Sequence, residues 1–409
     1  MNFNELYFNS GSLTRRHFSS DLEDSLDEGR LFLRFIQKAK KPCDYERQLL
    51  RDHAGRLDAI MDGALVPPYE LEIQPSGACN LRCKHCFGRF YPHLPDKIGL
   101  TEMKSLVQNV CSFQENGFRV ETAKFCGTTG EPLLNTATLY GIERFKAEGR
   151  KVILYTNGVL LNGALPDSRP YRDFILQADK LNLSLDAGSA ETFKKIKGAD
   201  CFNNVLRGLK NLAQRKKEIN SGLNIITSYV IGNENCHEIS RAAKIARETG
   251  ANEIWFRVDF TNLRQIKEIA PAIKESLDEA KTFEDGNFRV VSVYSENEFN
   301  SNGAAFSAQK SGCFNHYFWA CIGPNGHLYP CGHRTHAGVE SFGNVLEHPL
   351  RDLWANRERI QKVSYLPDKQ CTVCSPSSGR RNEFVDFLFK IGFDRTWELC
   401  ERHQDILNS

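Results

Sequence analysis

The sequence GACNLRCKHCFGRF at residues 77–90 carries three cysteines at the spacing C-x3-C-x2-C. It directly follows an apolar, strand-like run from Tyr69 to Gln74. Cys79, Cys83 and Cys86 can ligate three irons of a cubane iron–sulfur cluster, which leaves the fourth iron without a protein ligand. An iron with an open position can bind another molecule, so the spacing predicts a catalytic cluster. A zinc site is the alternative, with His85 or His93 as its fourth ligand.

The composition excludes several classes of protein. The 409 residues include 53 Lys and Arg against 51 Asp and Glu, a formal net charge of +2. Nucleic-acid binding usually needs a strongly basic face, so a nucleic-acid partner is disfavoured. No stretch is apolar enough for a signal peptide or a membrane span, which predicts a cytoplasmic protein without a membrane partner. Fourteen cysteines in a reducing compartment indicate metal ligation rather than disulfides.

From Tyr69 onward, short β-prone runs alternate with amphipathic helical stretches. This alternation predicts repeated βα units around a parallel sheet, which is an α/β fold. The six strand candidates begin at Tyr69, Val120, Lys151, Lys180, Leu223 and Glu253. Six strands are too few for the common eight-stranded closed barrel, so we expect a partial, open (β/α)6 barrel. Its active site should lie at the carboxyl ends of the strands.

The chain is expected to divide into four segments. Residues 1–68 carry apolar residues at helical intervals and predict a helical N-terminal extension. Residues 69–287 form the partial barrel, and residues 288–380 form a small β-hairpin and helix module held by metal. Residues 381–409 read as a C-terminal helix with an apolar face that packs on the body.

Polar and glycine-rich sequences stand where three of the predicted strands end. They are Gly127-Thr-Thr-Gly-Glu-Pro132, Tyr155-Thr-Asn-Gly158 and Ser184-Leu-Asp186. Glycines let the backbone approach a ligand closely, and alternation puts Ser184 and Asp186 on one face of their strand. Ordinary turns and satisfied strand-end polar residues are the alternative for each sequence. Their common position nevertheless favours a single binding site.

Taken together, these features resemble the radical S-adenosylmethionine superfamily, whose motif is C-x3-C-x-aromatic-C. His85 occupies the aromatic position here, and Thr129 stands where the family usually has a glycine. The resemblance implies that the open iron chelates S-adenosylmethionine, whose cleavage yields a 5′-deoxyadenosyl radical that takes a hydrogen atom from the substrate. It also implies cofactor contacts from His85, Gly130, Glu131, Asn157, Ser184, Asp186, Asn224 and Arg257.

A second cysteine group lies in the last third of the chain. Cys313-x12-Gly326-x4-Cys331 is followed by Cys371-x2-Cys374, and this order resembles the SPASM/twitch extension of the same superfamily. The resemblance implies one auxiliary [4Fe–4S] cluster, fully ligated by Cys313, Cys331, Cys371 and Cys374. A zinc ribbon built from the same four thiols is the alternative, and Cys321 or Cys400 can replace one of them.

Several residues near the second group are candidates for contact with substrate. Cys321 is the candidate catalytic residue, as a hydrogen-atom or proton donor to a substrate radical, with a plain hairpin position as the alternative. The aromatic run 316–319 would line the substrate cavity or form hairpin core. His333, Arg334 and His336 would face the cavity or lie in an exposed loop.

These features favour a radical S-adenosylmethionine oxidoreductase or lyase. It would abstract a hydrogen atom from a small polar substrate, such as a sugar or an aminocyclitol, in an oxidation, dehydration or rearrangement. The resemblance implies an electron donor such as flavodoxin or ferredoxin. The alternatives are a ribosomal-peptide maturase of the SPASM type and, from another class, a non-catalytic zinc or iron–sulfur scaffold protein.

Overall fold

The computed structural model describes most of the predicted barrel and part of the second cysteine module. The described residues are 53, 55–57, 59–60, 62–89, 91–259, 262–292, 313–366, 371, 382 and 385. Most of the predicted N-terminal extension, most of the predicted C-terminal helix, Cys374 and Cys400 lie outside them. The described residues between His53 and Ile60 are helical, as expected for that stretch.

The strands and helices alternate along the chain from Glu70 to Ser292. The strands are β1 (Glu70–Ile73), β2 (Gln114–Glu115), β3 (Phe118–Arg119), β4 (Thr122–Phe125), β5 (Lys151–Thr156), β6 (Lys180–Ser184), β7 (Asn224–Ile231), β8 (Glu253–Val258), β9 (Arg289–Ser292), β10 (Trp319–Ile322) and β11 (Leu328–Tyr329). The α-helices are α5 (Leu100–Ser112), α6 (Ala137–Ala147), α7 (Tyr171–Ile175), α8 (Ala190–Lys197), α9 (Phe202–Glu218), α10 (Ile239–Glu248), α11 (Leu263–Glu268), α12 (Ala270–Lys281), α14 (Leu350–Ala355) and α15 (Arg357–Ser364). Short 3-10 helices include η2 (Phe87–Arg89), η3 (Pro132–Leu134), η4 (Cys236–Glu238), η7 (Asn315–Tyr317) and η8 (Gly332–Arg334).

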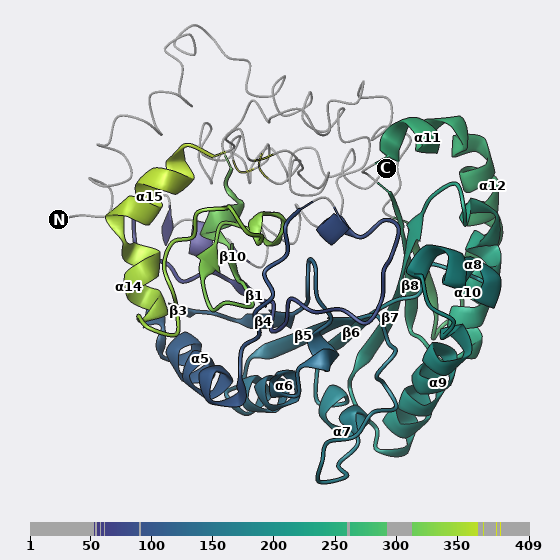
Figure 1. Cartoon of the computed structure of the whole chain (residues 1–409), viewed down its shortest axis with the longest axis horizontal. Helices are drawn as coiled ribbons and strands as arrows, with labels where there is room; N and C mark the ends of the chain where they lie inside the picture. Colours follow the sequence, from purple (N-terminus) through teal and green to yellow (C-terminus); the bar gives the residue numbers. More distant parts are fainter. Residues whose placement is uncertain are drawn as a thin grey trace, which may run out of the picture.

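The six predicted strands are present as β1, β4, β5, β6, β7 and β8, and neighbours in this series pair in parallel. They belong to a nine-stranded sheet with the order β11-β10-β1-β4-β5-β6-β7-β8-β9. Figure 1 shows the strands in an arc, with α5, α6, α9, α10 and α12 along its outer side. In the described sheet β11 is the first strand and β9 is the last, and these two edge strands are not neighbours. The sheet is therefore not closed, and the prediction of an open α/β barrel is confirmed.

The sheet is larger than predicted at both ends. β9 follows the predicted domain boundary at residue 287 and pairs in parallel with β8. β10 and β11 form the predicted hairpin, but β10 also pairs in parallel with β1, with Glu72 opposite Cys321. The hairpin therefore completes the sheet instead of forming a separate layer, and the predicted domain bounds stay predictions.

Alternation along the strands decides which side chains meet the helices. In β1, Leu71 and Ile73 are fully buried and join the main core together with residues of α5 and α6 such as Leu106 and Ile142. Successive side chains of a strand point to opposite faces, so Glu70, Glu72 and Gln74 lie on the inner face of the sheet. The outer face of β1 is thus apolar, and its polar side chains lie on the inner face.

Among the helices of the described residues, none combines the length and the apolar character needed to cross a lipid bilayer.

Candidate active site

The first cysteine group lies in the loop that leaves the carboxyl end of β1. Its members are Cys79, Cys83 and Cys86. The Arg82 N–H donates to the Lys197 carbonyl at 3.0 Å, and the Lys84 N–H donates to the Ile196 carbonyl at 2.8 Å. The last carbonyls of a helix lack partners inside that helix, so the end of α8 is free to hold this loop on both sides of Cys83.

The turn after β4 packs directly against the start of the cysteine loop. A side-chain carbon at Gly130 would lie 1.8 Å from the Ser76 carbonyl oxygen, so no other residue fits without displacing the backbone. The Glu131 N–H donates to the Ala78 carbonyl at 2.8 Å. The structure therefore brings Gly130 and Glu131 beside Cys79, as the sequence predicts, and explains the need for a glycine by backbone contact.

Glu131 is buried, and its carboxylate joins the ends of β4 and β5. It accepts hydrogen bonds from the Leu133 N–H at 3.0 Å, the Thr156 hydroxyl at 2.7 Å and the Asn157 N–H at 2.8 Å. Burial raises the pKa of Glu131, and these hydrogen bonds oppose the rise. Because protein donors occupy its oxygens, Glu131 positions the turn, and its predicted direct contact with the cofactor stays a prediction.

Asn157 links β5 to the cysteine loop. Its side-chain N–H donates to the Asn80 side-chain oxygen at 2.7 Å and also lies 3.8 Å from the Cys79 sulfur. The next residue, Gly158, has a φ of 79°, a left-handed conformation that favours glycine. Gly158 thus allows the turn, and Asn157 holds the segment that carries Cys79.

Asp186 lies at the end of β6 and is fully enclosed by protein. Its carboxylate forms an ion pair with the Lys197 ammonium, lies 3.3 Å from His85 Nε2 and accepts the Val230 N–H at 2.7 Å. Although burial favours the neutral acid, Lys197 and then His85 hold the pKa of Asp186 well below its usual range. His85 therefore has an acidic partner that an aromatic residue at this position would lack.

The remaining predicted cofactor contacts lie at opposite ends of their strands: Ser184 and Arg257 at or near the carboxyl ends, and Asn224 at the amino end. Ser184 ends β6, and Arg257 is near the end of β8, with its guanidinium 5.4 Å from the centroid of the Trp255 ring. Asn224 begins β7 and donates to Glu253 at 2.8 Å. At about 3.3 Å per residue, it lies roughly 20 Å from the carboxyl end of its strand. The structure therefore does not bring Asn224 to the end of the strand where the cysteine loop lies, and its role as a cofactor contact stays a prediction.

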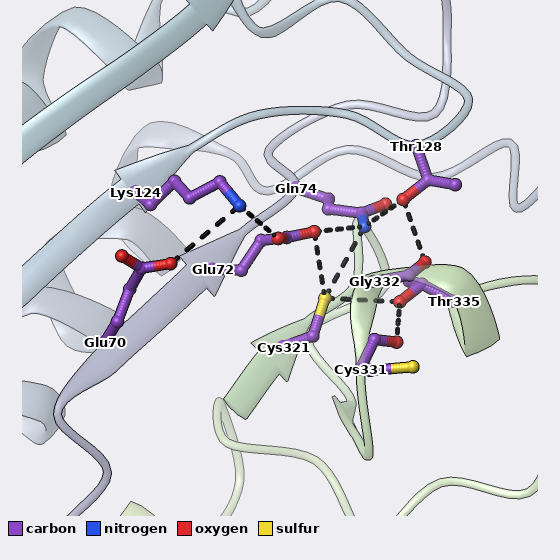
Figure 2. Close-up of polar contacts among 9 residues, drawn as sticks. All are labelled: Glu70, Glu72, Gln74, Lys124, Thr128, Cys321, Cys331, Gly332 and Thr335. Carbon is purple, nitrogen blue, oxygen red and sulfur yellow. Dashed lines mark hydrogen bonds and ion pairs between the residues drawn. The ribbon is translucent and has the colours of Figure 1, made fainter. Parts of the chain in front are cut away.

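A polar network covers the inner face between the two cysteine groups, and Figure 2 shows its members. The Lys124 ammonium lies 2.8 Å from a Glu72 oxygen and 3.8 Å from a Glu70 oxygen. Although burial favours the neutral acid, Lys124 and the neighbouring hydrogen bonds lower the pKa of Glu72 to about 2. The side chains of Glu72 and Lys124 keep 18% and 21% of their surface exposed, so this charged pair remains accessible from the inner face.

Gln74 connects this network to the turn after β4 and to the hairpin that carries Cys321. Its side-chain N–H group lies 2.7 Å from the Thr128 hydroxyl, 3.1 Å from Glu72 and 3.5 Å from the Cys321 sulfur. Thr128, in the turn after β4, in turn donates to the Gly332 carbonyl at 2.8 Å. The sequence analysis did not identify Glu72, Gln74 or Lys124. A signal for these residues was present in the sequence. Charged and amide side chains alternate there with apolar ones, which is unusual for a strand buried in a parallel sheet.

Cys321 is 1% exposed at the centre of this network. Its sulfur lies 3.2 Å from the Thr335 hydroxyl, and its thiol donates to Glu72 at 3.8 Å. Burial, and next the Glu72 carboxylate, raise the pKa of Cys321 well above its usual value. A thiol that donates to a carboxylate carries its hydrogen, which is the form that a hydrogen-atom donor requires.

The described cysteines of the second group lie close together. Burial, and then the neighbouring Cys313 and Cys371, raise the pKa of Cys331 to about 12. The Arg334 guanidinium donates to the Cys371 sulfur at 3.5 Å. Arg334 is thus buried beside a predicted ligand, which disfavours the exposed-loop alternative for this residue. Cys374 lies outside the described residues, so its ligand role stays a prediction.

The aromatic run beside Cys313 forms core. Phe314 and Phe318 belong to a small apolar cluster with Leu57 and Ile60. His316 is 2% exposed, and burial together with Arg359 lowers its pKa to about 3. The hairpin-core alternative is therefore favoured over a cavity lining for His316 and Phe318.

The residues present fit an iron–sulfur cluster at the first cysteine group. The three cysteines lie on one loop that backbone hydrogen bonds hold in place. Burial raises the pKa of Cys83 to about 11, whereas the buried Lys197 ammonium acts to lower it. Positive charge at this point suits the negative charge that iron-bound thiolates carry.

Replacing Cys371 with alanine should remove the second cluster and spare the first. We expect the iron content to fall from about eight to about four per chain, because a cubane held by fewer thiolates is poorly retained. Iron analysis after anaerobic reconstitution measures the change, with the half-buried Cys201→Ala as control. An iron content that does not change would remove Cys371 from the ligand set.

Comparisons with known proteins agree with this geometry. A family model described as "Radical SAM superfamily" matches residues 73–246, and one described as "Iron-sulfur cluster-binding domain" (SPASM) matches residues 313–375. Together they span more than half of the chain. Among curated proteins, the "AdoMet-dependent heme synthase" of Methanosarcina barkeri is 25% identical over 312 residues, which cover 70% of this chain and 82% of that protein. A "Probable GTP 3',8-cyclase" of Saccharolobus islandicus is 30% identical over 192 residues, 46% of this chain and 56% of that protein.

The solved structure of SuiB from Streptococcus suis bound to its precursor peptide SuiA has a similar fold. The TM-score is 0.54 at 16% identity, over 92% of this chain and 82% of that chain. SuiB bound to S-adenosylmethionine gives a TM-score of 0.53 at 16% identity, over 90% of this chain and 79% of that chain. The chain therefore belongs to the radical S-adenosylmethionine superfamily, carries a SPASM-type domain, and has as its cofactors S-adenosylmethionine, a [4Fe–4S] cluster and auxiliary iron–sulfur ligation.

Proposed function

We propose that this chain abstracts a hydrogen atom from a small polar substrate, such as a sugar or an aminocyclitol, in an oxidation, dehydration or rearrangement. The observation that carries the proposal is the accessible charged network of Glu70, Glu72 and Lys124 on the inner face of the sheet. Gln74 and Thr128 connect the end of β1, which leads into the loop of the first cysteine group, to Gly332, the residue after Cys331. A substrate at this place would lie between the cofactor and the auxiliary cluster.

The charges of the network favour hydroxyl and amino groups on the substrate. Two carboxylates face one ammonium, so the cluster of three carries a net negative charge. Carboxylates accept hydrogen bonds from hydroxyl and ammonium groups, and such charge-assisted bonds are among the stronger ones. An aminocyclitol offers both kinds of donor, whereas an anionic substrate would be repelled by Glu70 and Glu72.

The roles of the residues follow from their positions. When bound, S-adenosylmethionine supplies the group that removes the hydrogen atom. Glu131 and Asn157 hold the turns beside Cys79, and Ser184, His85 and Arg257 stand at the edge where the cofactor would bind. Glu72 and Lys124 would orient the substrate. The electron enters from an external reductant, for which flavodoxin or ferredoxin is the proposed class.

Cys321→Ser tests the role of the thiol as a hydrogen-atom donor in a rearrangement. There the S–H would give its hydrogen atom to the product radical, and the thiyl radical left behind would take one electron from the external reductant and one proton from solvent. Serine keeps a hydroxyl that can bond to Thr335 and Glu72, but an O–H gives up a hydrogen atom far less readily than an S–H. We expect product formation to fall at least about tenfold, while release of 5′-deoxyadenosine continues. Liquid chromatography and mass spectrometry of both products from one reaction measure this. If Cys321 only fills the hairpin core, product and 5′-deoxyadenosine will fall together or stay unchanged.

The substrate class is tested by the dependence of cofactor cleavage on added compounds. The reconstituted full chain is reduced with dithionite in the presence of aminocyclitols, neutral sugars, sugar phosphates or peptides. We expect an amino-bearing polyol to raise 5′-deoxyadenosine release at least about tenfold over the substrate-free rate, and the Glu72→Gln variant to lose this increase. Stimulation by sugar phosphates alone, or by peptides alone, would contradict the proposal.

A peptide maturase is the second candidate. It is favoured by the fold likeness to SuiB, whose structure holds a precursor peptide. At 16% identity this likeness concerns the fold alone. The peptide arm of the assay separates the two candidates.

A further inference from the structure

Asn382 is a fully buried asparagine that contacts the segment directly after Cys313. It is 0% exposed, and its side-chain oxygen accepts the Phe314 N–H at 2.8 Å and the Asn315 N–H at 3.1 Å. Cys313 is the first predicted ligand of the second cysteine group. The family model of the iron–sulfur domain matches residues 313–375, so Asn382 makes this contact from a part of the chain outside that match.

The two N–H groups stand at the start of η7, where a helix has donors without partners inside the helix. The residue at the N-cap usually accepts such donors with a side-chain oxygen. Here that residue is Phe314, whose side chain makes no capping hydrogen bond. Asn382 supplies the missing acceptor from 68 residues further along the chain. The turn after Cys313 therefore depends on a distant segment for its hydrogen bonds.

Hydrogen bonds fix the backbone before and after Cys313. Its own N–H donates to the Leu366 carbonyl at 3.1 Å, while Asn382 accepts the next two N–H groups. Val385, three residues after Asn382, is 1% exposed and packs in the same apolar cluster as Phe314. The residues that hold this cysteine in place thus come from later parts of the chain, on both sides of Cys371 in the sequence.

The second cysteine group has the chemistry that an iron–sulfur cluster needs. Its members are thiols, the usual ligands of such clusters. The buried Arg334 guanidinium donates to the Cys371 sulfur at 3.5 Å, and positive charge suits thiolates that bind iron. A cluster needs all its ligands at once, so a cysteine whose backbone is already fixed loses less conformational freedom on binding iron.

We propose that Asn382 is a positioning residue for the auxiliary cluster: it fixes the backbone after Cys313 and thereby slows the loss of iron. This inference rests on the predicted ligand role of Cys313. The Asn382 oxygen is occupied by two N–H groups, so the residue acts through Cys313 and is not itself a ligand. Removing a residue that orients a metal ligand typically costs about 10- to 100-fold in metal affinity.

The experiment measures how fast iron leaves the reconstituted full chain when an iron chelator is added under anaerobic conditions. Asn382→Leu removes the acceptor at similar volume, and we expect the auxiliary cluster to lose iron at least about tenfold faster. Electron paramagnetic resonance of the reduced chain identifies the cluster that is lost, because S-adenosylmethionine changes the signal of the first cluster. Asn382→Asp keeps an oxygen acceptor, so its rate should stay within about twofold of the parent rate.

A general loss of stability is the competing explanation, and Asn109→Leu is the matched control for it. The Asn109 oxygen accepts the Leu350 N–H at 2.7 Å, and its N–H group donates to the Val345 and His348 carbonyls at 2.7 and 2.9 Å. This asparagine also holds the C-terminal part of the chain, but it does so at the start of α14. Asn109→Leu should lower the denaturant midpoint of the metal-free chain and keep the rate of iron loss within about twofold of the parent rate.

Three results would overturn the proposal. They are an unchanged rate in Asn382→Leu, equal acceleration in Asn382→Leu and Asn109→Leu, and iron loss from Asn382→Asp as fast as from Asn382→Leu. If Asn382→Leu does not fold, Asn382→Ala replaces it, because alanine leaves space for a water molecule that can accept the two N–H groups. Asn382→Ala should still lose iron faster than the parent, since that water is not fixed by the chain, and an unchanged rate counts against the proposal.

Cys313→Ala separates a failure of the ligand assignment from a failure of the role of Asn382. If Cys313 is a ligand, this variant should retain about four of about eight irons per chain. Full retention of iron would mean that Cys313 is not a ligand, and the proposal would fall with that assignment. Loss of iron from Cys313→Ala together with an unchanged rate in Asn382→Leu would keep the ligand and overturn the positioning role alone.

Discussion

Cys83→Ala should abolish the reductive release of 5′-deoxyadenosine and remove about four irons per chain. Cys83 is the middle ligand, and hydrogen bonds from both its neighbours, Arg82 and Lys84, tie it to the end of α8. With two thiolates remaining, a cubane has two irons without protein ligands and dissociates. Product analysis under dithionite reduction, together with iron counting, measures the loss.

The control for this variant is a cysteine outside both groups. Cys236 is half-buried, and its thiol lies 3.8 Å from the Asn233 carbonyl. Cys236→Ala should keep its full iron content and its rate of cofactor cleavage. If Cys83→Ala still released 5′-deoxyadenosine at a substantial rate, the assignment of Cys79, Cys83 and Cys86 as the catalytic ligand set would be wrong.

Glu131→Gln should lower the free energy of unfolding by about 3 kcal/mol, because no amide orientation satisfies the three donors around it. If the amide nitrogen faces the Asn157 N–H, two donors meet. If the amide is turned over, its nitrogen faces the Leu133 N–H and the Thr156 hydroxyl instead. In either case a buried backbone N–H loses its acceptor.

Denaturant unfolding of the anaerobic protein measures this change. Glu148→Gln is the matched control, since Glu148 is 44% exposed and pairs with Arg144 at 3.4 Å on the surface of α6. Exposed pairs of this kind contribute about 0.3–0.5 kcal/mol. Equal destabilisation by the two variants would mean that the three hydrogen bonds to Glu131 do not hold the turn.

The strands were predictable from the sequence because their apolar faces pack on helices. Leu71 and Ile73 alternate with polar residues, whereas β5 is a continuous run of β-prone residues from Val152 to Tyr155. β9 was missed, since four residues at the edge of the sheet give only a short pattern. The pairing of β10 with β1 was also missed, because no local pattern records which strand a distant hairpin will join.

The candidate site was predictable only where its residues form a local sequence pattern. Cysteine spacing is a local property of the sequence, so the three candidate ligands after β1 could be proposed from it. The sequence pattern assigned Asn224 to a strand, and the structure places it at the amino end of that strand, away from the cysteine loop. Glu72, Lys124 and Lys197 act through partners that are distant in sequence, and only the folded chain brings these partners together.

The parallel pairing of β10 with β1 has a consequence for biosynthesis. Glu70 pairs with Trp319, so one neighbour of β1 in the sheet is β10. The ribosome synthesises β10 about 250 residues after β1. Until then β1 is an exposed edge, open to association with other nascent chains. A truncated polypeptide that ends before residue 313 would keep that edge permanently, and we expect it to aggregate rather than to accumulate as a free-standing barrel.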